Sequence, residues 1–145
     1  MIREFKKEDE DAIISIWLQA SEEAHGFIDA SYWREKVEEM RSIYLPSSKT
    51  FVYRDPQTLE LQGFISLIEN YIAAVFVRPD RQGKGIGKQL LDFAKDLYEN
   101  LDLRVYSENL RSVRFYKNQG FEPLSEEIDE NTGHPETVMR YTSNR

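Results

Sequence analysis

The first fifty residues place apolar side chains at helical spacing between polar breaks. The apolar stripe of a first helix is Ile13, Ile14, Trp17 and Leu18. Acidic residues 8–11 precede this stripe and suit a first helical turn, where carboxylates meet the positive end of the helix dipole. A second helix is predicted to begin near Asp29 or Ser31 and to stop before Pro46, because the residue before a proline disfavours helical dihedral angles. Residues 2–5 are predicted to form a short strand.

The middle of the chain changes to strand-like patterns separated by turn residues. Residues 50–54, 63–68 and 71–77 are rich in β-branched, aromatic and other apolar residues, with turns expected around residues 55–56 and Asn70. Three strands so closely spaced predict an antiparallel meander. Residues 71–77 are apolar throughout, so this strand is predicted to be central and covered on both faces.

Helices and strands alternate in the remainder of the chain. The predicted elements are a strongly amphipathic helix at 86–98, a strand at 101–106, a short helix at 109–119 and a strand pair at 121–126 and 137–141. Gly120 suits the position just after the short helix. The order βααβββαβαββ belongs to the α+β class, with a mixed sheet and helices on both faces. No repeat or linker interrupts it, so residues 1–145 are expected to form a single domain.

The amino-acid composition excludes several kinds of site and partner. Of the 145 residues 40% are hydrophobic and 31% are charged, which suits a globular protein. The chain has no cysteine and two histidines, His25 and His134. Disulfides, thiolate metal sites and a cysteinyl acyl-enzyme are therefore excluded, and no metal centre is expected. A net charge of −7 argues against general nucleic-acid binding. Neither a secretory signal nor a membrane span is visible, so we expect a cytoplasmic protein that does not bind membranes.

A basic island interrupts this acidic chain. It contains Arg78, Arg81, Lys84 and Lys88 against a single acidic residue, Asp80. Three glycines alternate within residues 82–87, directly before a predicted helix. Glycines let the backbone approach an anion, and a helix N-terminus supplies unpaired N–H groups, so a phosphate-binding loop is predicted. The spacing fits neither a P-loop nor a dinucleotide fingerprint. A flexible, solvated connection is the plainer alternative.

Two motifs frame the region between residues 77 and 121. The first reads Val77-x-Pro79 and then Gln82-x-x-Gly85-x-Gly87. The second reads Asn109-x-x-Ser112-x-x-Phe115-Tyr116-x-x-x-Gly120-Phe121. Together, and in this order, they resemble the two cofactor motifs of the GNAT superfamily of acetyl-CoA-dependent N-acetyltransferases. The predicted elements fit that family from residue 1 to residue 141. Residues 24–28 and 129–135 resemble segments of small bacterial members, some of them similar to protein lysine acetyltransferases.

The resemblance implies that acetyl-CoA binds as the acyl donor. Backbone N–H groups of residues 82–87 would hold its pyrophosphate. The fourth strand, residues 71–77, would pair with the pantetheine arm and splay from the fifth strand, residues 101–106, to admit it. Asn109 and Ser112 would lie against the cofactor. The implied cofactor-binding residues are Val75, Phe76, Val77, Gln82, Gly83, Lys84, Gly85, Ile86, Gly87, Lys88, Asn109, Ser112 and Tyr116.

Tyr116 is the candidate general acid. The resemblance places it near the thioester sulfur, and a phenol with a pKa of about 10 can donate a proton to the departing thiolate. Simple packing beside Phe115 is the alternative role. Without a cysteine, direct attack of the amine in a ternary complex is the expected mechanism. A backbone N–H of a bulged strand near Val75 is expected to polarise the thioester carbonyl.

The sequence does not identify the general base that deprotonates the acceptor amine. Many GNAT enzymes place a carboxylate on the fourth strand, but residues 72–75 of this chain contain none. Glu69, at the preceding turn, could act through water, and His25 could act directly because its ordinary pKa is near 6.5. A third route uses no dedicated base and relies on proximity and desolvation.

The acceptor is expected to enter between the first two helices and the final strand pair. His25, Phe27 and Trp33 are the candidate substrate-binding residues there, and acidic residues crowd both segments. A negative field attracts cations, so a primary amine is expected: a protein lysine, an N-terminal amine or a small amine. The alternatives are a non-catalytic acyl-CoA-binding module and a generic phosphate-binding domain. Monomer and homodimer are not distinguished.

Overall fold

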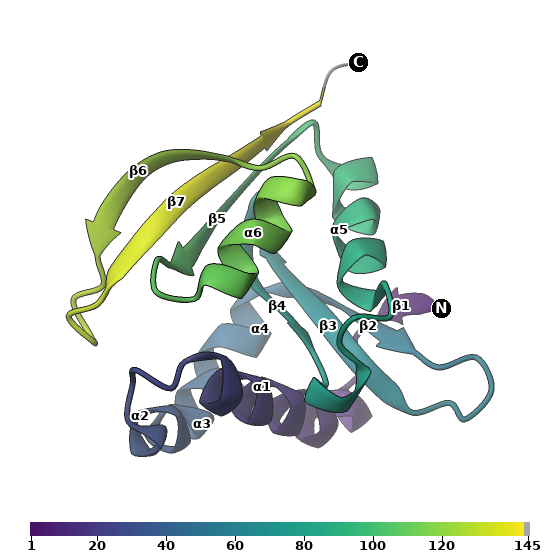
Figure 1. The fold of residues 1–145 in the computed structure, drawn as a ribbon. Coiled ribbons are helices and arrows are strands. Elements are labelled where there is room, and N and C mark those ends of the chain that lie inside the picture. Colours follow the sequence, from purple (N-terminus) through teal and green to yellow (C-terminus); the bar gives the residue numbers. More distant parts are fainter. Residues whose placement is uncertain (144–145) are drawn as a thin grey trace.

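A seven-stranded sheet in the order β1-β2-β3-β4-β5-β7-β6 forms the centre of the molecule (Figure 1). The computed structural model describes residues 1–143. The strands are β1 (Ile2–Glu4), β2 (Lys49–Arg54), β3 (Leu61–Ile68), β4 (Tyr71–Val77), β5 (Asn100–Tyr106), β6 (Glu122–Ile128) and β7 (Pro135–Thr142). Neighbouring strands are antiparallel except β4 and β5, which are parallel. The predicted meander and the mixed, largely antiparallel sheet are confirmed, and β7 lies between β5 and β6.

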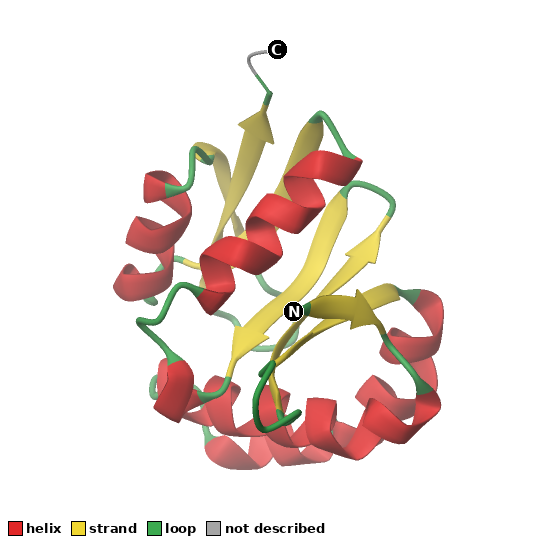
Figure 2. Cartoon of the chain, turned by 90° about the vertical axis from the view of Figure 1, so that its right-hand side faces the viewer, coloured by secondary structure: helices red, strands yellow, loops and turns green. Residues whose placement is uncertain are grey.

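Helices cover both faces of the sheet, as predicted (Figures 1 and 2). One side carries α1 (Glu10–Ala24), α2 (Ala30–Glu35), α3 (Val37–Glu39) and α4 (Leu45–Ser47), and the other carries α5 (Ile86–Leu97) and α6 (Leu110–Asn118). Shorter turns are η1 (Lys7–Asp9), the π-helical η2 (Met40–Tyr44) and η3 (Pro79–Arg81). Among residues 1–143 no helix is long and apolar enough to cross a membrane.

Each face of the sheet has its own hydrophobic core. Leu90 and Leu91 of α5 belong to one buried cluster together with Leu103 of β5. On the opposite face Ile13 of α1 belongs to a second cluster with Phe64 of β3. Burial of such a side chain stabilises the fold by about 1.5 to 3 kcal/mol. The two cores hold helices on both faces of the sheet, and β4 lies between them.

The segment between α1 and β2 departs from the prediction. The second helix does not stop before Pro46 but continues to Ser47 as α2, α3, η2 and α4. The π-helical turn explains this, because Leu45 N–H bonds to the carbonyl of Met40, five residues back. Pro46 then occupies the first turn of α4, where its missing N–H is not needed.

The predicted burial of β4 on both faces is wrong. Ala73 is exposed and residues 74–77 are half-buried, although every side chain of the strand is apolar apart from the hydroxyl of Tyr71. In residues 1–143 the pairing with β5 comprises Tyr71 with Asp102 and Ile72 with Leu103. Beyond these positions the two strands separate, which agrees with the predicted splay between the fourth and fifth strands. The C-terminal half of β4 therefore presents an apolar edge to an opening.

Candidate active site

A cavity of about 370 Å³ occupies the opening between β4 and β5. Residues 71–77 of β4 and residues 103–106 of β5 form two of its sides. The helices α1 and α2 contribute a third side, and the α6 segment contributes a fourth. Of the predicted cofactor-binding residues, those that line this cavity are Val75, Phe76, Val77, Gln82, Asn109, Ser112 and Tyr116. The structure thus brings both cofactor motifs to one cavity.

The glycine-rich loop runs from β4 into the N-terminus of α5. Gly83 has φ +80° and Gly85 has φ +84°, a left-handed conformation that glycine adopts without strain. Gly85 is the N-cap of α5, so the first backbone N–H groups of that helix have no helical partner. A Cβ on Gly87 would lie 3.1 Å from Cζ of Phe115. Two glycines therefore give the loop its left-handed turns before the helix, and the third lets α5 approach α6.

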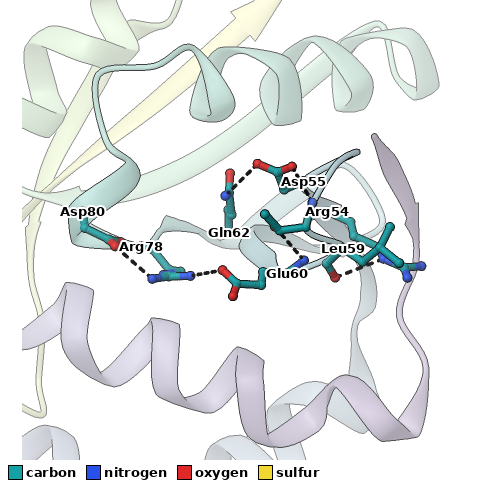
Figure 3. A network of polar contacts seen from close by, with 8 residues as sticks. Arg54, Asp55, Leu59, Glu60, Gln62, Arg78 and Asp80 are labelled. Carbon is teal, nitrogen blue, oxygen red and sulfur yellow. Dashed lines mark hydrogen bonds and ion pairs between the residues drawn. The ribbon is translucent and has the colours of Figure 1, made fainter.

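Arg78 at the base of this loop is committed to a polar network (Figure 3). Its Nη1 lies 3.3 Å from Oε2 of Glu60 and its Nη2 lies 2.9 Å from Oδ2 of Asp80. Its backbone N–H donates to the carbonyl of Gln62 at 2.8 Å, and the Gln62 amide donates to Asp55 at 3.2 Å. The network ties the turn between β2 and β3 to the start of the loop. The charge of Arg78 is balanced by neighbouring carboxylates.

The two lysines of the basic island, Lys84 and Lys88, differ in whether a carboxylate pairs with them. Both side chains are exposed. Lys88 Nζ lies 2.6 Å from Oδ2 of Asp92, whereas Lys84 has no ion-pair partner among residues 1–143. Residues 83–88 do not line the cavity itself. The island therefore offers fewer unpaired cations than its sequence indicates, and an anion at this loop would rely chiefly on backbone N–H groups.

Tyr116 lies on α6 and lines the cavity. Its ring packs on Phe115 and Phe121, with centroids 5.4 Å and 5.8 Å away. Burial raises the pKa of Tyr116, so the hydroxyl keeps its proton at neutral pH. In the described part of the chain this hydroxyl has no hydrogen-bond partner. Packing and a proton-donating role are therefore compatible, because the ring packs while the side chain also faces the cavity.

Asn109 joins α6 to the end of α1. It is the N-cap of α6, and its Oδ1 accepts a hydrogen bond from Ser112 N–H at 3.2 Å. Its Nδ2 lies 3.4 Å from Nε2 of His25. Because an amide nitrogen only donates, His25 accepts at Nε2 and carries its own proton at Nδ1. The predicted cofactor ligand Asn109 is thus also the anchor of the helix that carries Tyr116.

His25 is not placed to act as a base in this arrangement. It is 7% exposed, and burial lowers its pKa to about 4, against a smaller opposite effect of the Ser21 backbone. The imidazole is therefore neutral at physiological pH, and its one lone pair faces Asn109. His25 lines the cavity and contributes a neutral ring that contacts the N-cap of α6.

The other predicted acceptor residues divide between the cavity and its surroundings. Trp33 lines the cavity and is 8% exposed. Phe27 does not line it, but packs against His25 and Tyr106 with ring centroids 5.7 Å and 5.6 Å away. The rings of His25, Tyr32, Trp33 and Tyr106 line the cavity and form its aromatic wall. Phe27 supports this wall by packing against His25 and Tyr106.

Two positions predicted on or beside β4 need correction. Glu69 is exposed at the turn between β3 and β4, with φ +53°, and is not among the residues that line the cavity. The bulge lies at Ala73 rather than near Val75, because Ser66 pairs with Ala74 while the next residue, Leu67, pairs with Ile72. A turn residue at the paired end of β4 points to solvent, whereas the cleft opens at the strand's other end.

Several cavity residues were not predicted from the sequence. Tyr71, Arg104, Tyr106 and Glu136 come from β4, β5 and β7. Tyr106 stands directly opposite Glu136 in the register of β5 and β7. Period-2 alternation in β5 could have shown that Arg104 and Tyr106 share a face. The position of Glu136 depends on the register of β7, which no local pattern reveals.

Comparison with known proteins agrees with this geometry. The model of the acetyltransferase (GNAT) domain matches residues 6–143. The chain belongs to the GNAT family. It is 33% identical over 142 residues to peptidyl-lysine N-acetyltransferase YiaC of Escherichia coli (strain K12), covering 97% of this chain and 96% of that protein. It is also 33% identical to peptidyl-lysine N-acetyltransferase YjaB of Salmonella typhimurium (strain LT2) over 138 residues, 95% of this chain and 94% of that protein.

A solved structure extends the agreement to the whole GNAT fold. The solution structure of apo-form YjaB from Escherichia coli matches with a TM-score of 0.87 at 27% identity, covering 99% of this chain and 97% of that one. The chain is an N-acetyltransferase of the GNAT type. Its relatives are named as enzymes, so the alternative of a non-catalytic binding module gains no support.

Proposed function

We propose that this GNAT enzyme transfers the acetyl group of acetyl-CoA directly to the ε-amine of a lysine side chain in a protein. The observation that carries the proposal is the single cavity that runs from the free edge of β4 to Tyr116 and on to the aromatic wall. One space can thus hold an acyl arm and an acceptor chain together. The absence of cysteine excludes a cysteinyl acyl-enzyme and supports a ternary complex.

Acetyl-CoA as donor is supported by the arrangement of β4 and the glycine loop. Among residues 1–143 the C-terminal half of β4 has no partner strand on the cavity side, so its backbone is available to pair with the amides of a pantetheine arm. The loop that follows ends at the N-terminus of α5, where a diphosphate is favoured. The direction of β4 therefore sets the orientation of the cofactor, with its pyrophosphate at the loop and its acyl end beside the cavity.

Tyr116 is assigned the role of general acid. The thiolate of coenzyme A needs a proton as the carbon–sulfur bond breaks, and the buried phenol retains its proton at neutral pH. A backbone N–H of β4 next to the bulge at Ala73 is assigned the thioester oxygen, since donors aimed at a developing oxyanion stabilise it by about 2.7 to 4 kcal/mol. Among the described residues β4 pairs with β5 only at Tyr71 and Ile72, so later N–H groups on that side of β4 are free to donate.

A lysine acceptor is favoured over an N-terminal or small amine by the relatives, both named peptidyl-lysine N-acetyltransferases. The shape of the cavity is compatible with that assignment. Aromatic rings of Tyr32, Trp33 and Tyr106 line it, and such rings pack along an alkyl chain and attract a cation. A lysine side chain presents both features.

The proposal is tested with purified protein, acetyl-CoA and three matched acceptors: a lysine peptide with a blocked N-terminus, a lysine-free peptide with a free N-terminus, and spermidine. Release of free coenzyme A and the mass of the product are measured. We expect acetylation of the blocked lysine peptide and intersecting double-reciprocal plots. Parallel plots, or exclusive acetylation of either other acceptor, would contradict the mechanism or the acceptor respectively.

A further inference from the structure

A carboxylate on β7 lines the cavity. Glu136 lines the cavity together with Tyr106, its partner in the register of β5 and β7. Residues 72–75 of β4 contain no carboxylate, and Glu69 lies outside the cavity. Among the described residues Glu136 is the acidic side chain that lines this space.

The Glu136 carboxylate is half-buried but unpaired. Within residues 1–143 it makes no hydrogen bond or ion pair. The nearby cation Arg104 is held by Glu127 at 2.5 Å. A carboxylate removed from water without a partner is costly, and a cation that enters the cavity would relieve that cost. The site is therefore suited to a positively charged guest.

We propose that Glu136 binds the ammonium group of the acceptor and accepts its proton before attack. This inference rests on the proposed acetyltransfer to a lysine and names the base of that reaction. The aromatic side chains across the cavity provide room for the methylene chain, while the carboxylate fixes the nitrogen at the end of that chain. The acceptor class is thus a primary alkylammonium on an extended chain.

The electrostatic surroundings of Glu136 favour this role. Burial raises its pKa, the Asp129 carboxylate raises it further, Arg104 lowers it and Glu127 raises it. A carboxylate whose pKa is raised is a stronger base than one in water. The titratable and charged groups that face it from the packed elements are Tyr71 of β4, Arg104 and Tyr106 of β5, Glu127 of β6, Asp129 of the hairpin, and Tyr32 and Lys36 across the cavity.

A hydrogen-bond network holds this negative field in place. The Tyr106 hydroxyl donates to Oδ2 of Asp129 at 2.5 Å, and the Thr132 hydroxyl donates to the same oxygen at 3.2 Å. The Asp129 backbone N–H donates to the carbonyl of His134 at 2.9 Å. Tyr106 therefore positions the hairpin charge beside Glu136, and it does so from within the cavity wall.

The reaction balances in protons and bonds. The acceptor ammonium gives one proton to Glu136, and its nitrogen then forms a bond to the thioester carbonyl carbon. The carbon–sulfur bond breaks, the sulfur takes a proton from Tyr116, and the nitrogen loses its second proton, which restores the phenol through solvent. Glu136 releases its proton to solvent, so the amide, free coenzyme A and one proton are the products.

The test compares Glu136→Gln with Glu130→Gln, a matched change at an exposed position of the same hairpin. With a lysine peptide at pH 7.5, we expect kcat/KM of Glu136→Gln to fall by about 100-fold or more, while acetyl-CoA binding by thermal shift stays at the wild-type level. Glu130→Gln should match wild type. An active Glu136→Gln enzyme, within about twofold of wild type, would overturn the assignment.

A second acceptor separates proton removal from structural damage. The lysine is replaced by S-aminoethylcysteine, which has the same length and a more acidic ammonium. If Glu136 removes the proton, the deficit of Glu136→Gln should shrink with this acceptor and again as the pH is raised towards 10. A deficit that is equal for both acceptors at every pH would reject the base. Wild-type protein that acetylates no peptide would instead reject the proposed function itself.

Discussion

Tyr116 combines two properties at one residue, a packed ring and a side chain that lines the cavity. In Tyr116→Phe the packing remains and the proton donor is lost. We therefore expect kcat to fall by about 10- to 1,000-fold while acetyl-CoA affinity stays unchanged, because an interaction specific to the transition state has been removed. Initial-rate kinetics and calorimetric titration measure the two quantities. Wild-type turnover in this variant would leave Tyr116 as a packing residue.

His25 makes a prediction about stability rather than proton transfer. Its pKa is lowered from 6.5 to about 4 by burial. Between these two pH values the unfolded chain binds a proton that the folded chain does not, so the free energy of unfolding falls as the pH drops from about 6.5 to about 4. At about 1.4 kcal/mol per unit of pKa, the full loss is on the order of 3 kcal/mol.

Urea unfolding of His25→Gln at pH 7 and pH 4.5 measures this effect. We expect the variant to lose less stability than wild type between the two pH values, because the titrating imidazole is gone. His134→Gln, which leaves His25 in place, should behave as wild type. The acidic limb of kcat/KM should persist in His25→Gln, and its disappearance would instead identify His25 as the base.

At the scale of elements, the glycine loop links backbone conformation to cofactor binding. Gly85 has φ +84°, and a Cβ there would have no atom of residues 1–143 within 4 Å, whereas Gly26 has equally open space and no positive φ. Gly85→Ala should therefore cost about 1 to 2 kcal/mol of stability through the dihedral angle alone and weaken acetyl-CoA binding. Gly26→Ala is the matched control. Equal thermal shifts with acetyl-CoA in both variants would show that the conformation of the loop does not contribute to cofactor binding.

Sequence periodicity predicted most elements because local forces determine them. The stripe on α5 and the turn at Gly120, where φ is +92°, follow from helical spacing and from the conformational freedom of glycine. The segment around Pro46 was predicted incorrectly, since a π-helical turn shifts the hydrogen bonds by one residue and accommodates the proline. The exposure of β4 was also missed, because an apolar strand beside an open cavity has the same sequence pattern as a buried one.

For the whole molecule, cavity residues that belong to continuous motifs were predictable, and those that depend on strand pairing were not. The glycine loop and the Asn109–Tyr116 segment are continuous motifs, so their residues are visible in the sequence. Glu136 reaches the cavity through the insertion of β7 between β5 and β6 and its register with Tyr106. Glu69 lies closer to β4 along the chain but points to solvent at the paired end of the strand. Tertiary pairing, which sequence spacing does not encode, selects between these two carboxylates.

We propose that coenzyme A binds between the glycine loop and the opening of β4 and β5. Titration of isotope-labelled protein with coenzyme A, followed by backbone amide NMR, tests it residue by residue. We expect the largest shift changes in residues 82–87, in residues 73–77 of β4 and in residues 109–116 of the α6 segment. Changes confined to other surfaces, or no saturable change at all, would show that coenzyme A does not bind at this site.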